Sequence, residues 1–309
     1  MTPERVASDL PSGHTTGTAA EPVVVRDHRP TVLEMLRDTW GYRGLVIPLG
    51  LRQVVKGYSG TRLGRPWLVI RPLFSIFGMT LIFGSVLNAP SNGVPYLLFL
   101  LVGMIGWLVI ERTVFWATRS FDSYRKVVGR LEVPVLLAPT AATAPMLVDV
   151  GIMTLIAVGA SIYYLITEGT LSVQMEPSLA LAAAGLALAL ALGWGLGLWL
   201  ATLNALARDV RIMLRFVLPI WLYVTPVIYP ASALPDRWQF LATINPAAAP
   251  VELVKEGVLG VGSVDTLSLG VSIGASLVLI ASGLWFLTTL SPTLLHGPEF
   301  LDDEEEERI

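Results

Sequence analysis

Long apolar runs are the feature that most constrains the fold of this chain. Six stretches of roughly 20 residues or more carry few charges, and each is long enough to cross the roughly 30 Å hydrocarbon core of a bilayer as a helix. Of the 309 residues, 53% are hydrophobic and 15% charged, which indicates an all-α integral membrane protein rather than a soluble domain. We expect six transmembrane helices at 67–87, 95–118, 145–166, 178–206, 212–229 and 266–290.

The fifth run and the loop after it are the least regular parts of this pattern. Pro219, Pro226 and Pro230 predict that the fifth helix is kinked or broken. Residues 230–265 are largely apolar, but they are interrupted at Asn245-Pro246, and each half is too short to span a membrane. We therefore expect a re-entrant helix pair before the last span.

Lysine and arginine are distributed unevenly between the two sides of the predicted bundle. Of the 21 such residues, all but Arg237 and Lys255 fall on the side that carries both chain ends. Because positive loops remain in the cytoplasm, the pattern predicts that both termini are cytoplasmic.

The segments outside the apolar runs differ in character. The N-terminal residues lack hydrophobic periodicity and predict a disordered extension. From Thr31, with Glu34 three residues later, the spacing predicts a capped amphipathic helix, lying either in the membrane interface or packed on the protein surface. The predicted regions are a cytoplasmic extension (1–30), the amphipathic interface helix with a basic segment (31–66), the transmembrane domain (67–290) and an acidic cytoplasmic tail (291–309).

The basic segment runs directly into the first apolar run, at Trp67. Cations at this position either anchor the chain to an anionic leaflet or handle an anionic, membrane-bound substrate. The residues concerned are Arg52, Lys56, Arg62 and Arg65, around Leu63 and Gly64.

Small residues recur every four positions along the fourth run. Such a stripe lets helix backbones approach closely, although alanine-rich spans also produce it by chance. The partner could belong to the same chain or to a second copy. The stripe consists of Gly185, Ala189, Gly193, Gly197, Ala201 and Ala205.

Several kinds of chemistry are missing from the sequence. It has no cysteine, its three histidines lie outside the apolar runs, and it contains no Gly-Lys dipeptide. We therefore expect no metal site, no catalytic site and no P-loop. Four ionisable residues lie near the predicted cytoplasmic ends of the spans, where structural ion pairs are favoured over a proton relay. They are Arg71, Glu111, Arg112 and Asp149.

Several motifs together resemble the permease subunits of ATP-binding-cassette exporters for bacterial polysaccharides, such as O-antigen, teichoic acid and galactan. The resemblance runs in the same order from about 31 to 290. Its residues are Arg52, Lys56, Tyr58, Leu63, Gly64, Trp67 and Pro72, then Ala207 to Val210 with Ile220-Trp221 and Thr225 to Pro230, and finally Asn245-Pro246 with Val251 to Leu253.

This resemblance implies a transport subunit rather than an enzyme, located in the bacterial cytoplasmic membrane. Two copies would form a channel for a polysaccharide carried on a polyprenyl pyrophosphate lipid. A separate ATPase dimer would bind ATP and Mg, so this chain needs no cofactor and has no nucleic-acid partner. The basic segment would then receive the lipid headgroup.

Two further sets of residues receive roles through the resemblance. Aromatic residues that share helix faces are candidates for a pore along which sugar rings stack, although core or lipid contact is the alternative. The cytoplasmic stretch after the second span, together with the helix from Thr31, is a candidate for coupling to the ATPase. The pore candidates are Phe74, Phe77, Trp221 and Tyr229, and the coupling candidates are Phe121, Asp122, Tyr124, Arg125 and Lys126.

Two other functions remain open at this point. A membrane enzyme acting on lipid-linked sugars would need acidic or histidine residues clustered at one membrane face, and the sequence shows no such cluster. A permease for a small molecule or drug would share the same architecture, and the identity of the neighbouring gene would separate it from a glycan exporter.

Overall fold

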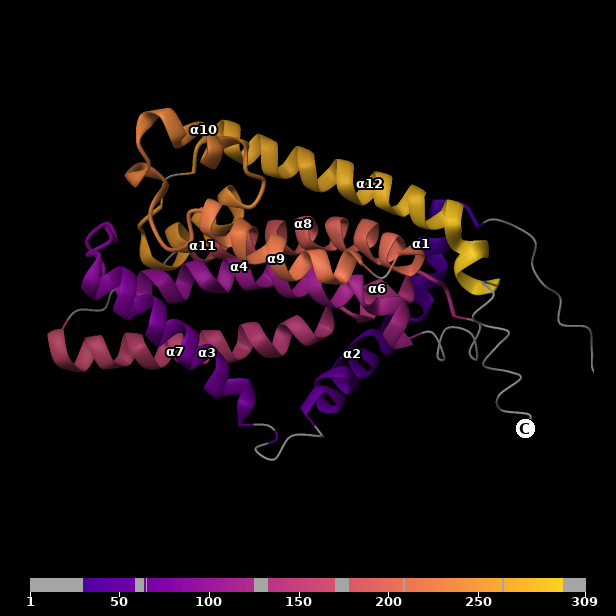
Figure 1. The fold of residues 1–309 in the computed structure, drawn as a ribbon, viewed down its shortest axis with the longest axis horizontal. Helices are drawn as coiled ribbons and strands as arrows, with labels where there is room; N and C mark the ends of the chain where they lie inside the picture. Colours follow the sequence, from indigo (N-terminus) through magenta and orange to yellow (C-terminus); the bar gives the residue numbers. More distant parts are fainter. Residues whose placement is uncertain are drawn as a thin grey trace, which may run out of the picture.

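The computed structural model describes residues 30–58, 64, 66–124, 133–169, 178–207, 209–262 and 264–296. These residues form helices joined by loops and contain no strand (Figure 1). The elements are α1 (Val32–Gly41), α2 (Arg43–Tyr58), α3 (Trp67–Met79), the π-helix η1 (Thr80–Val86), α4 (Tyr96–Thr118), α6 (Leu137–Ala141), α7 (Ala144–Glu168), α8 (Ser178–Leu206), α9 (Val210–Val224), the 3-10 turn η2 (Ala231–Ala233), α10 (Asp236–Ile244), α11 (Ala248–Leu259) and α12 (Thr266–His296).

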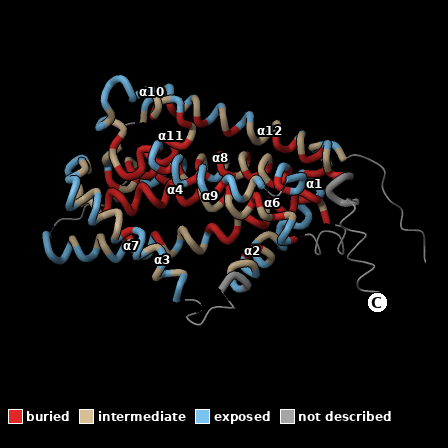
Figure 2. The backbone as a smooth tube through the Cα atoms, in the orientation of Figure 1, coloured by how far each residue is buried: buried red, intermediate tan, exposed pale blue. Residues whose placement is uncertain are grey.

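The long helices lie side by side along the long axis of the molecule, with α4 and α8 at the centre (Figure 1). Helix α4 is buried without interruption from Leu98 to Ile110, because α7, α8, α9 and α11 all pack against it. Helix α8 also contacts α12. Burial is concentrated in this central group, whereas α3 and the far half of α7 are largely exposed (Figure 2).

The two ends of the bundle differ in sequence and in charge. At one end lie α1, α6 and the C-terminal ends of α4, α8 and α12, and we call this the basic end (Figure 1). At the other end lie α10, α11 and the loop 87–95, and we call this the distal end. Among the described residues, Arg237 and Lys255 are the only cations in elements of the distal end. The fold therefore segregates charge as the sequence predicted.

Five helical segments are long and apolar enough to cross a membrane. They are Trp67–Val86, Tyr96–Thr118, Leu137–Glu168, Leu179–Leu206 and Thr266–Ser291.

The fifth predicted span, 212–229, corresponds to α9, which ends at Val224. Thr225 is extended (φ −84°, ψ 138°), because a residue before proline is disfavoured in the helical conformation. At 15 residues, α9 reaches only about 22 Å. That this segment crosses the membrane completely remains a prediction. Its helix ends several residues earlier than expected.

The small-residue stripe of α8 packs within the chain. A Cβ added at Gly185 would lie 2.8 Å from the Cβ of Leu253 in α11. A Cβ at Gly197 would lie 2.6 Å from the Cβ of Ala117 in α4, and one at Gly193 would meet Thr113 at 3.0 Å. The stripe therefore lets α8 approach both α4 and α11 closely.

Helix α1 begins with the predicted cap. The Thr31 side chain accepts a hydrogen bond from the Glu34 backbone N–H, and the Glu34 carboxylate accepts one from the Thr31 backbone N–H. One face of the helix packs on the bundle through Met35, which is 2% exposed. The other face leaves Leu33 and Trp40 exposed, so α1 carries both a packed and an exposed apolar face.

At the distal end, α10 and α11 are separated where the sequence predicted a break. The Asn245 side chain bridges this break to the end of α9. It donates to the Thr225 hydroxyl at 2.9 Å and accepts from the Trp221 indole at 2.9 Å and the Ala247 backbone at 3.0 Å. The two short helices are thus present, and their depth in a membrane remains a prediction.

Candidate functional site: an arginine-lined chamber

Two adjoining cavities open between α3, α4, α7 and α9, in the half of the bundle nearer the basic end. The larger has a volume of about 540 Å³ and also borders α2, and the smaller has a volume of about 210 Å³. Arg71, Glu111, Arg112 and Asp149 line both cavities. We therefore treat them as one space and call it the arginine chamber.

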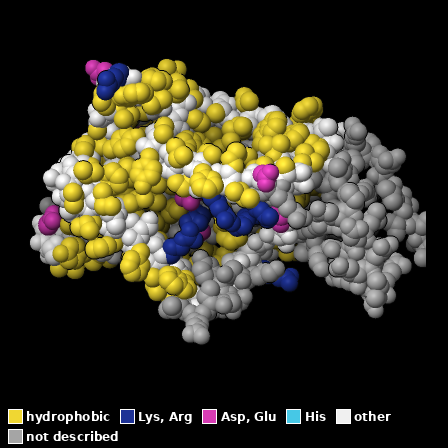
Figure 3. Space-filling model, in the orientation of Figure 1, with side chains coloured by type: hydrophobic (Ala, Val, Ile, Leu, Met, Phe, Trp, Pro, Cys, Tyr) yellow, Lys and Arg dark blue, Asp and Glu magenta, His cyan; other side chains and the backbone are white. Residues whose placement is uncertain are grey.

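Cations outnumber anions around this chamber. Two acidic residues, Glu111 and Asp149, face four arginines, which leaves two positive charges in excess. Figure 3 shows Lys and Arg side chains gathered in a row across this face, close to a few acidic ones. The arginines are Arg71 on α3, Arg112 on α4, Arg119 at the C-cap of α4 and Arg215 on α9.

Contacts within the protein neutralise only part of this charge. Arg112 Nε lies 3.5 Å from Asp149 Oδ2, with both side chains partly exposed. The Glu111 carboxylate accepts a hydrogen bond from the Trp107 indole at 3.1 Å. The other three arginines form no salt bridge with any residue that the structure describes.

Arg119 shows most clearly that the cations crowd one another. Its guanidinium lies over the Phe115 ring, 5.0 Å from the centroid. Burial lowers the pKa of Arg119, and the charges of Arg215 and Arg211 lower it further. Arginine stays charged in any case, so an anion in the chamber would relieve both the burial cost and the repulsion.

Two buried hydrogen-bond donors that line the chamber share one acceptor. Arg112 Nε and Trp116 Nε1 both interact with the Asp149 carboxylate, but neither forms a hydrogen bond of good geometry with any described residue. Buried donors in folded proteins nearly always have a partner. Both groups can only donate, and they share the Asp149 carboxylate, so an oxyanion bound in the chamber would give them a second acceptor.

The arrangement is suited to binding rather than to reaction. Guanidinium groups match the oxygen geometry of phosphates and carboxylates, and several of them together suit a group with more than one charge. Among the described residues there is no group of three that could hold a metal ion. The chamber can therefore hold a polyanionic group at the edge of the bundle.

A second polar contact lies beside the chamber, at the basic end. Asp122 Oδ2 accepts hydrogen bonds from Arg211 at the start of α9 and from Asn204 near the end of α8, each at 3.3 Å. We call this the Asp122 junction. The Tyr124 hydroxyl donates to the Leu49 backbone carbonyl of α2 at 3.2 Å, and burial raises the pKa of Tyr124 to about 12. The segment after α4 is thus bonded to α2, α8 and α9.

The structure describes only some of the predicted headgroup residues. Arg52 is exposed on α2, and Gly64 has a φ of +60°, which glycine adopts without strain. Lys56 belongs to α2, but its side chain lies outside the described part of the chain, as do Arg62, Leu63 and Arg65. The coupling candidates Arg125 and Lys126 also lie outside the described residues, whereas Phe121 is half-buried.

Sequence reasoning did not assign Arg119 and Arg215 to a site, and it treated Arg71, Arg112 and Asp149 as structural. The available signal was that each lies near the end of an apolar run. Their convergence depends on how α3, α4, α7 and α9 pack, and linear spacing does not contain that information.

The four candidate pore aromatics fall into two groups. Phe74 and Phe77 are 73% and 67% exposed on α3. Trp221 instead packs edge-on against Trp107 at 5.4 Å, and the Tyr229 hydroxyl donates to the Tyr223 carbonyl at 2.9 Å. A lining role for all four remains a prediction.

Comparison with known proteins places this architecture. The profile of the ABC-2 type transporter family matches residues 50–259, more than half of the chain. The chain belongs to the ABC-2 type transporter family. An O-antigen export system permease protein, RfbA from Myxococcus xanthus, is 24% identical over 214 residues, which cover 67% of this chain and 76% of that protein. The family-level resemblance seen in the sequence is thereby confirmed.

The ABC-2 match bears directly on the site. It includes the four arginines of the chamber, the Asp122 junction and the α10–α11 pair, whereas α1 and α12 lie outside it. An ABC-2 membrane domain is a multi-pass transport subunit rather than an enzyme, and the family implies a partner ATPase.

Proposed function

We propose that this chain is the permease subunit of an ATP-driven exporter that moves a polyprenyl-diphosphate-linked polysaccharide across the bacterial cytoplasmic membrane. The observation that carries the proposal is the arginine chamber, whose described lining has two positive charges in excess and two buried donors that share a single carboxylate, an arrangement that suits a diphosphate. Similarity to an O-antigen export permease supports the same class of cargo.

Orientation follows from the charge segregation. With the basic end in the cytoplasm, the chamber lies on the side where a lipid-linked glycan is assembled, and both termini are cytoplasmic. Two copies would enclose the path, and a separate ATPase dimer would bind ATP and Mg. The absence of any Gly-Lys dipeptide in the sequence supports this division of labour.

The basic segment and the chamber would act in succession. Arg52 would attract the anionic headgroup at the membrane surface, together with the other three cations of the basic segment, Lys56, Arg62 and Arg65. The chamber would then hold the diphosphate while the glycan enters between α3 and α9. Exposed Arg71 and Arg215 would meet it first, and the more enclosed Arg112 would meet it last.

Coupling to the ATPase would pass through the Asp122 junction. The segment 120–124 would sit on the ATPase, and its bonds to Arg211 would transmit a displacement to the start of α9. Because α9 also carries Arg215, the same motion would alter the chamber.

Reconstitution with the cognate ATPase tests the proposal. The chain alone should show no ATP hydrolysis, and the complex should hydrolyse ATP faster when a polyprenyl-diphosphate-linked glycan is added. Arg215→Gln should abolish that stimulation, while Arg52→Gln should weaken it and Arg237→Gln, at the distal end, should leave it unchanged.

Two outcomes would overturn the proposal. Turnover of ATP by the isolated chain would show that the energy source lies within it. Stimulation by small amphiphiles without a diphosphate, with no response to the lipid-linked glycan, would instead favour a small-molecule exporter.

A third outcome concerns the role of Arg215 alone. Loss of complex assembly in Arg215→Gln would show that this arginine is structural.

A further inference from the structure

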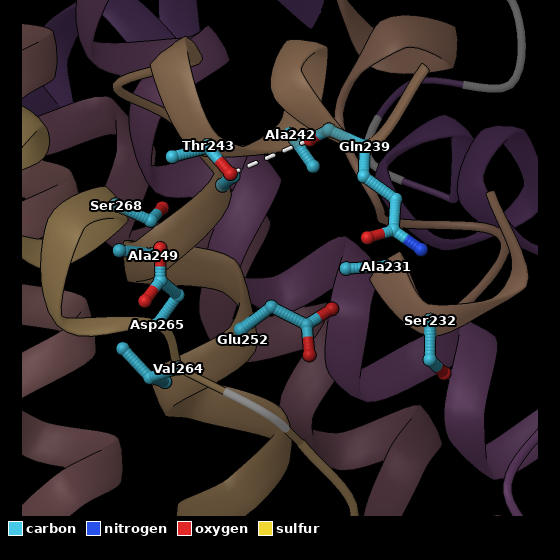
Figure 4. Close-up of a pocket in the computed structure, with 11 residues that line it drawn as sticks. Ala231, Ser232, Gln239, Ala242, Thr243, Ala249, Glu252, Val264, Asp265 and Ser268 are labelled. Atoms are coloured by element: carbon cyan, nitrogen blue, oxygen red, sulfur yellow. Dashed lines mark hydrogen bonds between the residues drawn. The ribbon is translucent and has the colours of Figure 1, made fainter. Parts of the chain in front are cut away.

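A second polar cavity lies at the distal end, between η2, α10, α11 and the start of α12 (Figure 4). Its volume is about 370 Å³, toward the lower part of the range of small-ligand sites, which is about 300–1,000 Å³. We call it the distal pocket. It shares no lining residue with the arginine chamber.

The distal pocket has a buried floor and an open rim. Glu252 and Ser268, which are 3% and 6% exposed, belong to the floor together with three buried alanines. Gln239, Asp265 and Ser232 are exposed and form the rim. Figure 4 shows these side chains surrounding an open centre. The alanines are Ala242, Ala248 and Ala249.

Several hydrogen-bonding groups in this pocket are available to a ligand. The Ser268 hydroxyl forms no hydrogen bond with any described residue, although the residue is more than nine-tenths buried. Gln239 uses its amide N–H groups on Leu234 and Asp236 but not its amide oxygen. The Asp265 carboxylate also has no partner among the described residues. Gln239 and Asp265 are exposed to solvent, whereas the buried Ser268 hydroxyl lacks a partner, and that indicates a site for a polar ligand.

The Glu252 carboxylate is held in place by the buried side chain of Lys255, which does not line the pocket. Lys255 is fully buried and lies 3.3 Å from Glu252 Oε1. The ammonium group also donates to the Pro226 and Tyr229 carbonyls and lies 4.0 Å from the centroid of the Phe99 ring. These contacts fix the carboxylate before any ligand arrives, which lowers the entropy lost on binding.

The charge of the distal pocket limits the class of ligand. Glu252 and Asp265 are acidic and none of the described lining residues is a cation, so a phosphate or uronate would be repelled. A divalent cation is also a poor fit, because the described residues contain no group of three metal-ligating side chains and Ca²⁺ needs six to eight oxygens. Carboxylate, amide and hydroxyl groups suit a ligand with several O–H donors.

We propose that the distal pocket binds an uncharged sugar residue of the glycan as the chain leaves the transporter. The inference rests on the function proposed above, because that function brings a sugar chain past this end of the bundle. The pocket would select at the exit for a neutral sugar, whereas the arginine chamber selects for a charged headgroup.

Binding of free sugars to the full chain in lipid nanodiscs tests the inference. Saturation-transfer NMR would compare galactose, glucose, rhamnose and N-acetylglucosamine with glucuronate and glucose 6-phosphate. At least one neutral sugar should bind, and the two anionic sugars should not. Asp265→Asn and the space-filling Ala231→Phe should each weaken that binding about tenfold. The matched control Glu168→Gln, an exposed acid at the same end but outside the pocket, should bind normally.

Each remaining outcome would overturn the inference: no neutral sugar binds, glucuronate binds more tightly, or binding survives both pocket variants. The assay contains neither ATPase nor lipid-linked glycan, so its result is independent of the export assay. Sugar binding without glycan-stimulated hydrolysis would refute the proposed function alone. Stimulated hydrolysis without sugar binding would refute the distal pocket alone.

Discussion

The arginine chamber and the distal pocket lie toward opposite ends of the bundle and border different helices, and their chemistry is opposite. The chamber collects arginines around two buried donors that share one carboxylate, whereas the described lining of the distal pocket consists of acceptors, hydroxyls and small residues without a cation. One therefore suits an anion and the other an uncharged polyol. Under the proposed function, the two ends of the bundle would recognise different parts of one cargo.

The two regions also differ in how their charges are supported. Beside the distal pocket, the cation Lys255 is fully buried and bonded on several sides. In the chamber, Arg71 and Arg215 are exposed and form no salt bridge with described residues. The Lys255–Glu252 pair at the distal end therefore supports the fold, whereas Arg71 and Arg215 of the chamber remain available to a ligand.

The largest expected effect comes from Lys255→Met. Removing this cation leaves Glu252 buried without its ion-pair partner and two carbonyls without their donor, which should lower the free energy of unfolding by about 3–5 kcal/mol. Thermal unfolding in detergent would measure it. Glu252→Gln in the same chain should restore part of the loss, and Arg237→Met should change stability by less than about 1 kcal/mol. If Lys255→Met changed the free energy of unfolding only slightly, Lys255 would not support the fold, and the contrast with the exposed arginines of the chamber would be wrong.

A smaller effect, on binding rather than folding, is expected for Arg215→Glu. Reversing this exposed charge should weaken binding of farnesyl diphosphate about 10–100-fold, since a hydrogen bond to a charged group contributes about 1.5–3 kcal/mol. Isothermal titration at two salt concentrations would measure the change. The matched reversal Asp265→Lys in the distal pocket should leave diphosphate binding unchanged. Equal losses in both variants would show that the two sites are not separate.

The smallest effect is expected at the Asp122 junction. Asp122→Ala breaks a pair whose side chains are about one-third exposed, and such a contact contributes about 0.2–1 kcal/mol. The number of ATP molecules hydrolysed per glycan exported should rise by up to about fivefold, while binding at both sites stays intact. Parallel assays of hydrolysis and transport would show this. An unchanged ratio would exclude coupling through this contact.

Much of the fold could be predicted because long apolar runs leave few alternatives in a membrane. The helices matching the first, second, third, fourth and last runs appear close to their predicted limits, and Thr31 caps α1 as its spacing predicted. The fifth run was placed correctly, but its helix ends at Val224, because Thr225-Pro226 stops it early. Both the correct start of α1 and the wrong end of α9 depend on a few residues that are adjacent in the sequence.

The site was less predictable. The basic segment drew attention because its cations are contiguous in sequence, yet the arginine chamber assembles Arg71, Arg112, Arg119 and Arg215 from three separate helices. The distal pocket gave no sequence signal at all. Its acids and hydroxyls are scattered between residues 232 and 268, and only Glu252 belongs to one of the motifs that carry the family resemblance.

The sequence by itself determined that this protein is a helical membrane subunit with segregated charge and no P-loop, because hydropathy, charge and motif are local properties. It also placed a small-residue stripe on α8 but left its partner open. Tertiary structure alone decided that the stripe packs on α4 and α11, that four arginines converge, and that acceptors gather at the distal end. Those outcomes depend on which helix faces meet, and that is settled by close approach and burial among residues far apart in the chain.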